Sequence, residues 1–106
     1  LDVRDGVKGV LDISALHNEK SCVFNLGHDE TMNVIKLADI VCDEMNLEKV
    51  QYKFTGGKRG WIGDSPLVDL DTNKAKNYGW YPSISIEDGI RETVRYLMSN
   101  ESRRFR

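Results

Sequence analysis

The chain is poor in the residues and runs that usually place a protein quickly. Its 106 residues include two cysteines, two histidines and two prolines. The longest apolar runs are too short to span a bilayer, and the first residues carry no apolar core of a signal peptide. Lys and Arg total 15 against 17 Asp and Glu, so no net positive charge attracts nucleic acid or an anionic membrane. We therefore expect a cytoplasmic protein whose partners include no nucleic acid and no membrane.

The two thiols and two imidazoles are too scattered for a disulfide framework or a metal site. Cys22 falls in a strand pattern and Cys42 in a helical pattern, which favours reduced core thiols over a disulfide. His17 has no second His or Cys at metal-ligand spacing, and His28 has no neighbouring nucleophile or base. We expect no metal ion and no catalytic residue in this chain.

What the chain does contain is a succession of helical and strand patterns, enough for one modest core. Apolar residues at helical spacing predict helices over residues 2–16, 33–45, 72–77 and from 86 onward, with Asn33, Asp71 and Ser85 suited to cap the last three. Short apolar or alternating runs predict strands over 22–26, 50–54, 67–70 and 83–85. The fold class expected is therefore α/β, a small α+β lobe with about four helices and three or four short strands. Strand, helix and strand over 22–54 favour a right-handed parallel crossover.

Several local features refine this picture. Gly6 and Gly9 weaken the first helix, so it is expected to pack closely against another surface. Trp80, between Gly79 and Pro82, is interpreted as a core anchor joining two helices, in preference to a platform that stacks on a base or sugar. The chain starts without Met on a helical pattern, which indicates a fragment or a processed product. Residues 1–98 are expected to form the folded lobe and 99–106 a frayed tail.

The loop over residues 56–64 has the composition of a binding site. It holds four glycines together with Lys58, Arg59, Trp61 and Asp64. Glycine lets the backbone approach a ligand closely, and the planar fork of an arginine matches a phosphate. A carboxylate such as Asp64 can accept hydrogen bonds from a ribose hydroxyl. The alternative is a solvated connection in which Lys58 and Arg59 face water.

Six segments in order carry a family resemblance. They are Phe-Asn-Leu-Gly at 24–27, Asn33 and Val34 with Leu37 and Ala38, Arg-Gly-Trp-Ile-Gly-Asp at 59–64, Asp71 with Lys74 and Ala75, Gly79 and Trp80 with Pro82, and Ile-Glu-Asp-Gly-Ile at 86–90. Together they resemble the C-terminal, substrate-binding lobe of the nucleoside-diphosphate-sugar epimerases. These enzymes are extended short-chain dehydrogenase/reductases of the UDP-glucose 4-epimerase type.

The resemblance implies an NAD-dependent isomerase that oxidises a sugar C4 hydroxyl and returns the hydride to the opposite face. This lobe would bind the nucleotide sugar, a UDP-sugar being expected, with Arg59 on the phosphates, Asp64 on the ribose and Val34 lining the nucleotide pocket. Many relatives place the arginine three residues before the aspartate, where this chain has Trp61. The register of Lys58, Arg59 and Trp61 against the diphosphate is therefore open.

Two motifs of the family are absent from the sequence. No G-x-x-G-x-x-G run follows a strand pattern, and none of the four tyrosines is followed by Lys four residues later. NAD would therefore be held by a Rossmann domain outside this chain, and the chain alone is expected to be inactive. An apolar face on the first helix and on residues 22–26 is expected to meet that domain or to drive self-association. A 4,6-dehydratase, a reductase, or a free-standing non-catalytic domain that binds a nucleotide or a protein are the alternatives.

Overall fold

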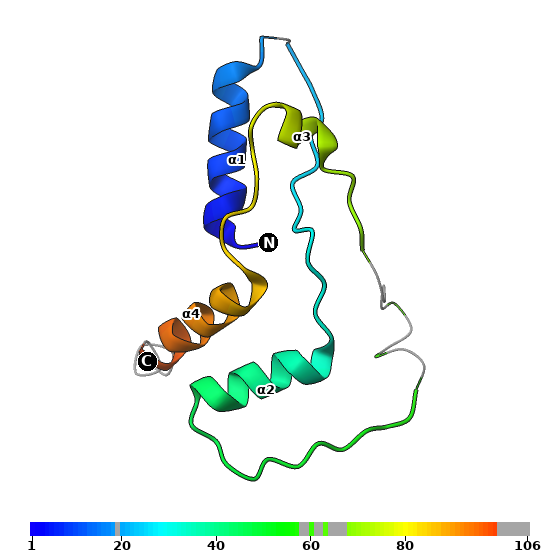
Figure 1. The fold of residues 1–106 in the computed structure, drawn as a ribbon, viewed down its shortest axis with the longest axis vertical. Helices are drawn as coiled ribbons and strands as arrows, with labels where there is room; N and C mark the ends of the chain where they lie inside the picture. Colours follow the sequence, from blue (N-terminus) through cyan, green and yellow to red (C-terminus); the bar gives the residue numbers. More distant parts are fainter. Residues whose placement is uncertain (19, 58–59, 61–62, 64–67, 100–106) are drawn as a thin grey trace.

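Four helices make up the regular structure of the chain. The computed structural model describes residues 1–18, 20–57, 60, 63 and 68–99. The helices are α1 (Val3–Leu16), α2 (Val34–Glu44), α3 (Asn73–Asn77) and α4 (Ile86–Ser99) (Figure 1). All four helices expected from the apolar spacing are therefore confirmed. The residues from 100 onward, most of the expected frayed tail, lie outside the described part.

The expected α/β class is wrong, because none of the described residues belongs to a strand. Residues 22–26, 50–54, 68–70 and 83–85 run between helices without ladder partners, and Leu67 lies outside the described part. A run of alternating residues forms a strand only where a second strand accepts its backbone hydrogen bonds. Here residues 23–25 contact α3 and its approach instead, through Lys74 on the Val23 carbonyl at 3.1 Å and Asn25 on the Asp71 carbonyl at 3.1 Å. The proposed parallel crossover is wrong for the same reason.

The boundaries of α2 follow from signals within a few residues of its ends. The Asn33 side chain accepts a hydrogen bond from the Lys36 amide at 2.8 Å, which confirms it as the N-cap. Asn46 has a positive φ of 54°, and the Leu47 amide donates back to the Cys42 carbonyl at 2.9 Å. This geometry satisfies carbonyls that the helix end leaves free.

The ends of α3 and α4 are also fixed locally. Asp71 accepts from the Asn73 amide at 2.9 Å, and Gly79, with φ of 83°, follows the end of α3. Ser85 accepts from the Asp88 amide at 3.0 Å and donates to the Asp88 carboxylate at 2.7 Å. Ser85 therefore caps α4 as expected.

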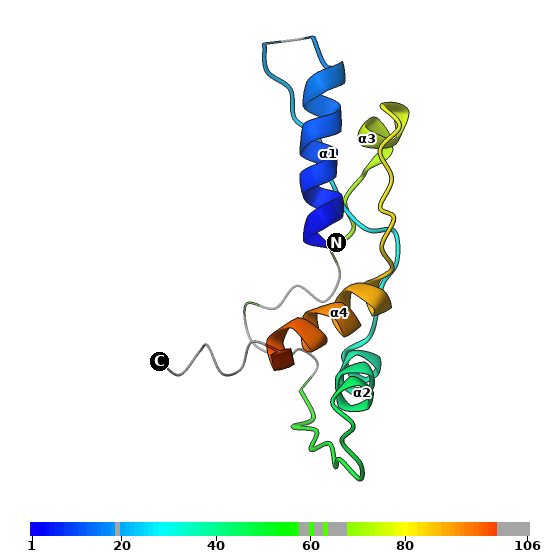
Figure 2. The same ribbon diagram turned by 90° about the vertical axis from the view of Figure 1, so that its left-hand side faces the viewer.

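Trp80 is the centre of the small core. Its side chain is 3% exposed, and its indole nitrogen donates to the Asp5 carbonyl at 3.0 Å. Ile13 and Ala75 are buried with it, and Phe24 and Leu26 pack against the cluster. Figure 2 shows α3 and the segment after it lying beside α1. The interpretation of Trp80 as a core anchor is confirmed.

Asp5 is a buried carboxylate whose role the sequence did not reveal. Its side chain accepts from the Ser83 hydroxyl at 2.7 Å and from the Ser83 and Ile84 amides at 2.9 Å each. Hydrogen bonds from Ser83 and Ile84 lower the pKa of Asp5, against the opposing effect of burial. The carboxylate therefore fixes the segment before α4 onto the first turn of α1.

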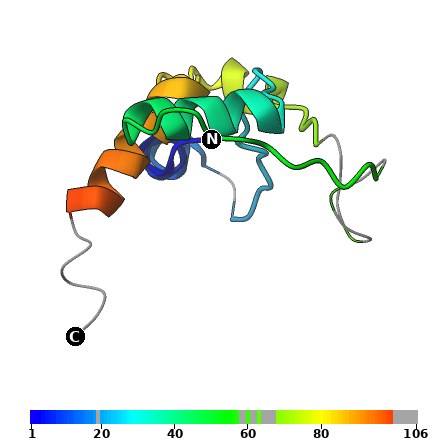
Figure 3. The same cartoon turned by 90° about the horizontal axis from the view of Figure 1, so that it is seen from below.

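α2 and α4 form the second packed unit, lying side by side and running in the same direction (Figures 1 and 3). Arg91 of α4 donates to Asp43 at 2.7 Å and to Glu44 at 3.1 Å, both on α2, and also pairs with Glu87. Arg95 forms an ion pair with Glu44. Arg91 is thus a partly buried link between the two helices.

The described helices do not close into one core. The radius of gyration is 17.6 Å, whereas a compact domain of this length has about 13 Å. On α1, the face opposite Trp80 is apolar and exposed, with Val3 75%, Val7 55%, Val10 58% and Leu11 64% accessible. An apolar surface on the first helix was expected from the sequence and is present.

Gly6 and Gly9 give a matched pair of tests for the packing of α1. A Cβ on Gly9 would lie 2.6 Å from the Trp80 indole nitrogen, whereas a Cβ on Gly6 would meet only Leu1 at 3.8 Å. Gly9→Ala should lower the free energy of unfolding by about 1–3 kcal/mol through overpacking. Gly6→Ala should raise it by about 0.5–1 kcal/mol, because alanine suits a helix interior better. Urea unfolding of both variants measures this, and equal effects would contradict the packing of Trp80 on Gly9.

Asp5 should make stability depend on acid pH. Because the folded-state pKa is lowered, its contribution is fully present above the unfolded-state value of about 3.9 and is lost as the pH falls through the folded-state pKa. Asp5→Asn should therefore be less stable than wild type at neutral pH, and the difference should shrink below about pH 4. Urea unfolding over a pH series tests this. A difference that stays constant down to the most acid pH would rule out the ionised carboxylate as its source.

Candidate functional site

The expected nucleotide site falls largely outside the described part of the chain. Lys58, Arg59, Trp61 and Asp64 are not among the described residues. Val34 is placed, as the first residue of α2, and its side chain is 79% exposed. That these five residues form one nucleotide site therefore stays a prediction.

The segment before residues 56–64 contacts α2 through Tyr52. The Tyr52 hydroxyl donates to Asp39 at 2.8 Å and lies 3.6 Å from the Cys42 thiol. Hydrogen bonds to Cys42 and Asp39 raise the pKa of Tyr52, because they favour its neutral form. The segment that leads into Gly56 is therefore held against the same helix that begins at Val34.

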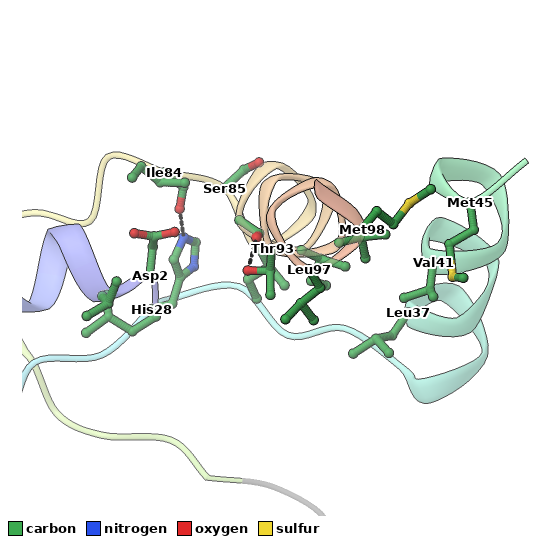
Figure 4. Close-up of a pocket in the computed structure, with 16 residues that line it drawn as sticks. Asp2, His28, Leu37, Val41, Met45, Ile84, Ser85, Thr93, Leu97 and Met98 are labelled. Atoms are coloured by element: carbon green, nitrogen blue, oxygen red, sulfur yellow. Dashed lines mark hydrogen bonds between the residues drawn. The ribbon is translucent and has the colours of Figure 1, made fainter. Parts of the chain in front are cut away.

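A groove of about 850 Å³ lies between α2 and α4 (Figure 4). We call it the α2/α4 groove. Its walls are mostly apolar and its few polar groups gather at one end. The lining residues are Leu1, Asp2, Val3, His28, Leu37, Val41, Met45, Ile84, Ser85, Ile86, Gly89, Ile90, Thr93, Val94, Leu97 and Met98. A volume of this size, with few polar groups, is in the range of ligand pockets.

The polar end of the groove is ordered by two networks. His28 accepts from the Glu30 amide through Nδ1 at 3.0 Å, so its other nitrogen carries the hydrogen and donates to the Ile84 carbonyl at 3.1 Å. Asp2 caps α1 and accepts from the Arg4 amide and guanidinium at 2.8 and 2.9 Å. The Arg4 contacts lower the pKa of Asp2 to about 2. Figure 4 shows His28 and Asp2 together, away from the α2 side chains.

The polar side chains at the end of the α2/α4 groove, Asp2 and His28, are engaged in bonds within the chain. Both ring nitrogens of His28 are engaged with the backbone, and Asp2 is an ionised carboxylate held by an arginine, so neither is poised to transfer a proton. No group of three His, Cys, Asp or Glu that could hold a metal ion occurs in the described part of the chain. Within the same part, no helix is long and apolar enough to cross a membrane.

Sequence reasoning missed this groove although its signal was visible. Leu37, Val41 and Met45 of α2 line one wall of the groove, and the apolar stripe of α4 lines the other. Each stripe does face the other helix, but two helices cover only part of each other, so Leu37 and Met45 stay 42% and 40% exposed. A groove of this kind is expected where the apolar stripe of one helix is wider than the surface that the neighbouring helix covers.

Both cysteines are free thiols, as expected, but only Cys42 is partly buried. Cys22 is exposed, so its interpretation as a core residue is wrong. The segment that holds Cys22 lies at the surface because it has no sheet to join. Lys74 approaches its sulfur at 2.6 Å.

Comparison with known proteins gives distant similarity only. No protein-family model matches the chain. It is 26% identical over 80 residues to GDP-L-fucose synthase 1 of Arabidopsis thaliana, an alignment that covers 72% of this chain and 22% of that protein. It is also 26% identical over 78 residues to an uncharacterized protein of Schizosaccharomyces pombe, covering 68% of this chain and 21% of that protein. The chain spans about a fifth of the length of these curated relatives. The resemblance to nucleotide-sugar enzymes is thus supported at the level of a distant relative.

His28 should contribute stability through both ring nitrogens. Replacing His28 with Ala removes the bonds to the Glu30 amide and the Ile84 carbonyl, each neutral bond being worth about 1 kcal/mol. The free energy of unfolding should fall by about 1–2 kcal/mol. In wild type, nitrogen-15 NMR should detect the neutral ring with its hydrogen on Nε2. The opposite tautomer, or an unchanged stability in His28→Ala, would contradict this arrangement.

Proposed function

We propose that this chain is the nucleotide-sugar-binding lobe of an NAD-dependent enzyme of the UDP-glucose 4-epimerase type. The observation that carries the proposal is the similarity over 72% of the chain to a protein named GDP-L-fucose synthase 1. GDP-L-fucose is a nucleoside-diphosphate sugar. The ordered segments of the sequence point independently to the same class of ligand.

The chemistry of residues 56–64 supports binding of a diphosphate. Arg59 offers a planar fork of donors that can bind two phosphate oxygens at once, and Lys58 adds a second positive charge. Asp64 supplies an acceptor for a ribose hydroxyl, and Trp61 a ring that can border the nucleotide. The exposed Val34 and the Tyr52 contact favour a nucleotide pocket that borders the first turn of α2.

NAD does not fit the described residues. A dinucleotide site needs a glycine-rich turn between a strand and a helix, and the described part of this chain has no strand. The cofactor would be held by a further domain, and this chain would contribute substrate binding without a catalytic residue. The exposed apolar face of α1 is a surface that such a domain could cover, and in its absence self-association through that face is expected.

Two alternatives remain within reach of experiment. The same lobe could serve a nucleotide-sugar 4,6-dehydratase or reductase. The similarity to GDP-L-fucose synthase 1 supports a GDP-sugar as the ligand, beside a UDP-sugar. A free-standing, non-catalytic domain that binds a nucleotide or a protein is the second alternative. The binding preference for UDP or GDP identifies the nucleotide, and absence of any diphosphate preference favours the second alternative.

Arg59→Ala tests the proposal directly. Loss of a charge-assisted bond to the diphosphate should weaken nucleoside-diphosphate binding by about 1.5–3 kcal/mol, while binding of the nucleoside alone should hardly change. Arg59→Lys should recover only part of the loss, because a point charge cannot form two parallel hydrogen bonds. Titration calorimetry with UDP, GDP and the two nucleosides measures these affinities.

The neighbouring lysine is the matched control. If the diphosphate preference survives Arg59→Ala and disappears in Lys58→Ala, the loop binds phosphate in a different register. If it survives both changes, residues 56–64 are not the phosphate site. Tight binding of NAD by this chain would contradict the assignment of the cofactor to a further domain.

A further inference from the structure

The thiol of Cys22 and the amino group of Lys74 are in contact in the described structure. The Lys74 amino nitrogen lies 2.6 Å from the Cys22 sulfur. The two side chains are therefore in direct contact. No water can lie between the two atoms at this distance.

Additional contacts hold the lysine in this position. The same nitrogen donates to the Val23 carbonyl at 3.1 Å and lies 4.5 Å from the centre of the Phe24 ring. Three consecutive residues, Cys22 to Phe24, therefore surround one amino group. Lys74 is on α3, which is held by the buried Ala75 and Trp80, so the pair joins two separate parts of the chain.

Cys22 is also open to small oxidants. Its side chain is exposed, whereas Cys42 is partly buried and contacts the Tyr52 hydroxyl at 3.6 Å. The reactivity of a thiol depends on its access and on its charged neighbours. Cys42 is therefore a control for the reactivity of Cys22, because its thiol is in the same chain but contacts a phenol.

We propose that Cys22 and Lys74 form a covalent link in which one oxygen atom joins the sulfur to the nitrogen. Dioxygen is the oxidant. The Lys74 ammonium first loses a proton to solvent, and the thiol and the neutral amine then lose one hydrogen each. One oxygen atom bridges sulfur and nitrogen, and the second leaves as water with the two hydrogens. The sulfur and the nitrogen each give two electrons to dioxygen, so atoms and electrons balance.

The link would tie the segment after α1 to α3 beside the Trp80 core. A crosslink between residues 22 and 74 restricts the unfolded chain, in the way that a disulfide does, and so stabilises the folded state. Reduction would return the free thiol and amine with water as the other product. The pair is independent of the proposed nucleotide site, and its test does not depend on that proposal.

Mass spectrometry of the whole chain after exposure to dioxygen tests the link. The oxidised protein should gain one oxygen and lose two hydrogens, and digestion should give one crosslinked peptide that contains both Cys22 and Lys74. A thiol reductant should restore the original mass, and the thermal unfolding midpoint should be higher in the linked form.

Four variants separate this reaction from others. Cys22→Ser and Lys74→Arg should abolish the product, whereas Cys42→Ser and Lys76→Arg should retain it. Lys76 is on the same helix as Lys74, but it pairs with Asp29, which precedes α2. Circular dichroism of each variant checks folding, and the two positions give independent losses. A disulfide as the sole product, oxidation of Cys22 to the same extent in Lys74→Arg, or no mass change in wild type would each overturn the proposal.

Discussion

The attachment of residues 80–84 to α1 determines where the remaining helices lie. The Asp5 carbonyl accepts from the Trp80 indole, and the Asp5 carboxylate accepts from Ser83 and Ile84. Because α4 begins at Ile86, these bonds fix its first turn relative to α1, and α2 packs along α4. The Ile84 carbonyl then accepts from His28, so the polar end of the α2/α4 groove depends on the same segment. A single residue of α1 thus positions both packed units.

The helices were predictable because their signals are local. Asn33 and Asn46 mark the two ends of α2 through bonds and backbone angles that involve only neighbouring residues. A strand cannot form from neighbouring residues alone, because its hydrogen bonds go to residues far away in the sequence. Residues 22–26 and 50–54 have the composition of strands, yet their contacts go to side chains of helices: Lys74 binds the Val23 carbonyl, and Asp39 accepts from Tyr52. Composition alone cannot reveal that the partner strand is missing.

The candidate functional surfaces also differ in how far they could be predicted, because some depend on neighbouring residues and others on contacts between distant ones. The loop over 56–64 could be singled out by composition, and its role in binding stays a prediction. The apolar stripes of α2 and α4 are visible in the sequence, but the groove between them depends on how far the two stripes overlap in space. The partners of Arg91 on α4, Asp43 and Glu44, are on another helix. A charged side chain at a helix surface gives no sequence signal of a partner so distant.

The packing of α1 bears on how the chain functions. One side of this helix holds Gly9 and Ile13 against Trp80, and the opposite side exposes Val3, Val7 and Leu11. A helix that is apolar on two sides is suited to lie between two layers, and the described chain provides only one. The radius of gyration of 17.6 Å, larger than the about 13 Å of a compact domain of this length, agrees with helices that do not close into one core.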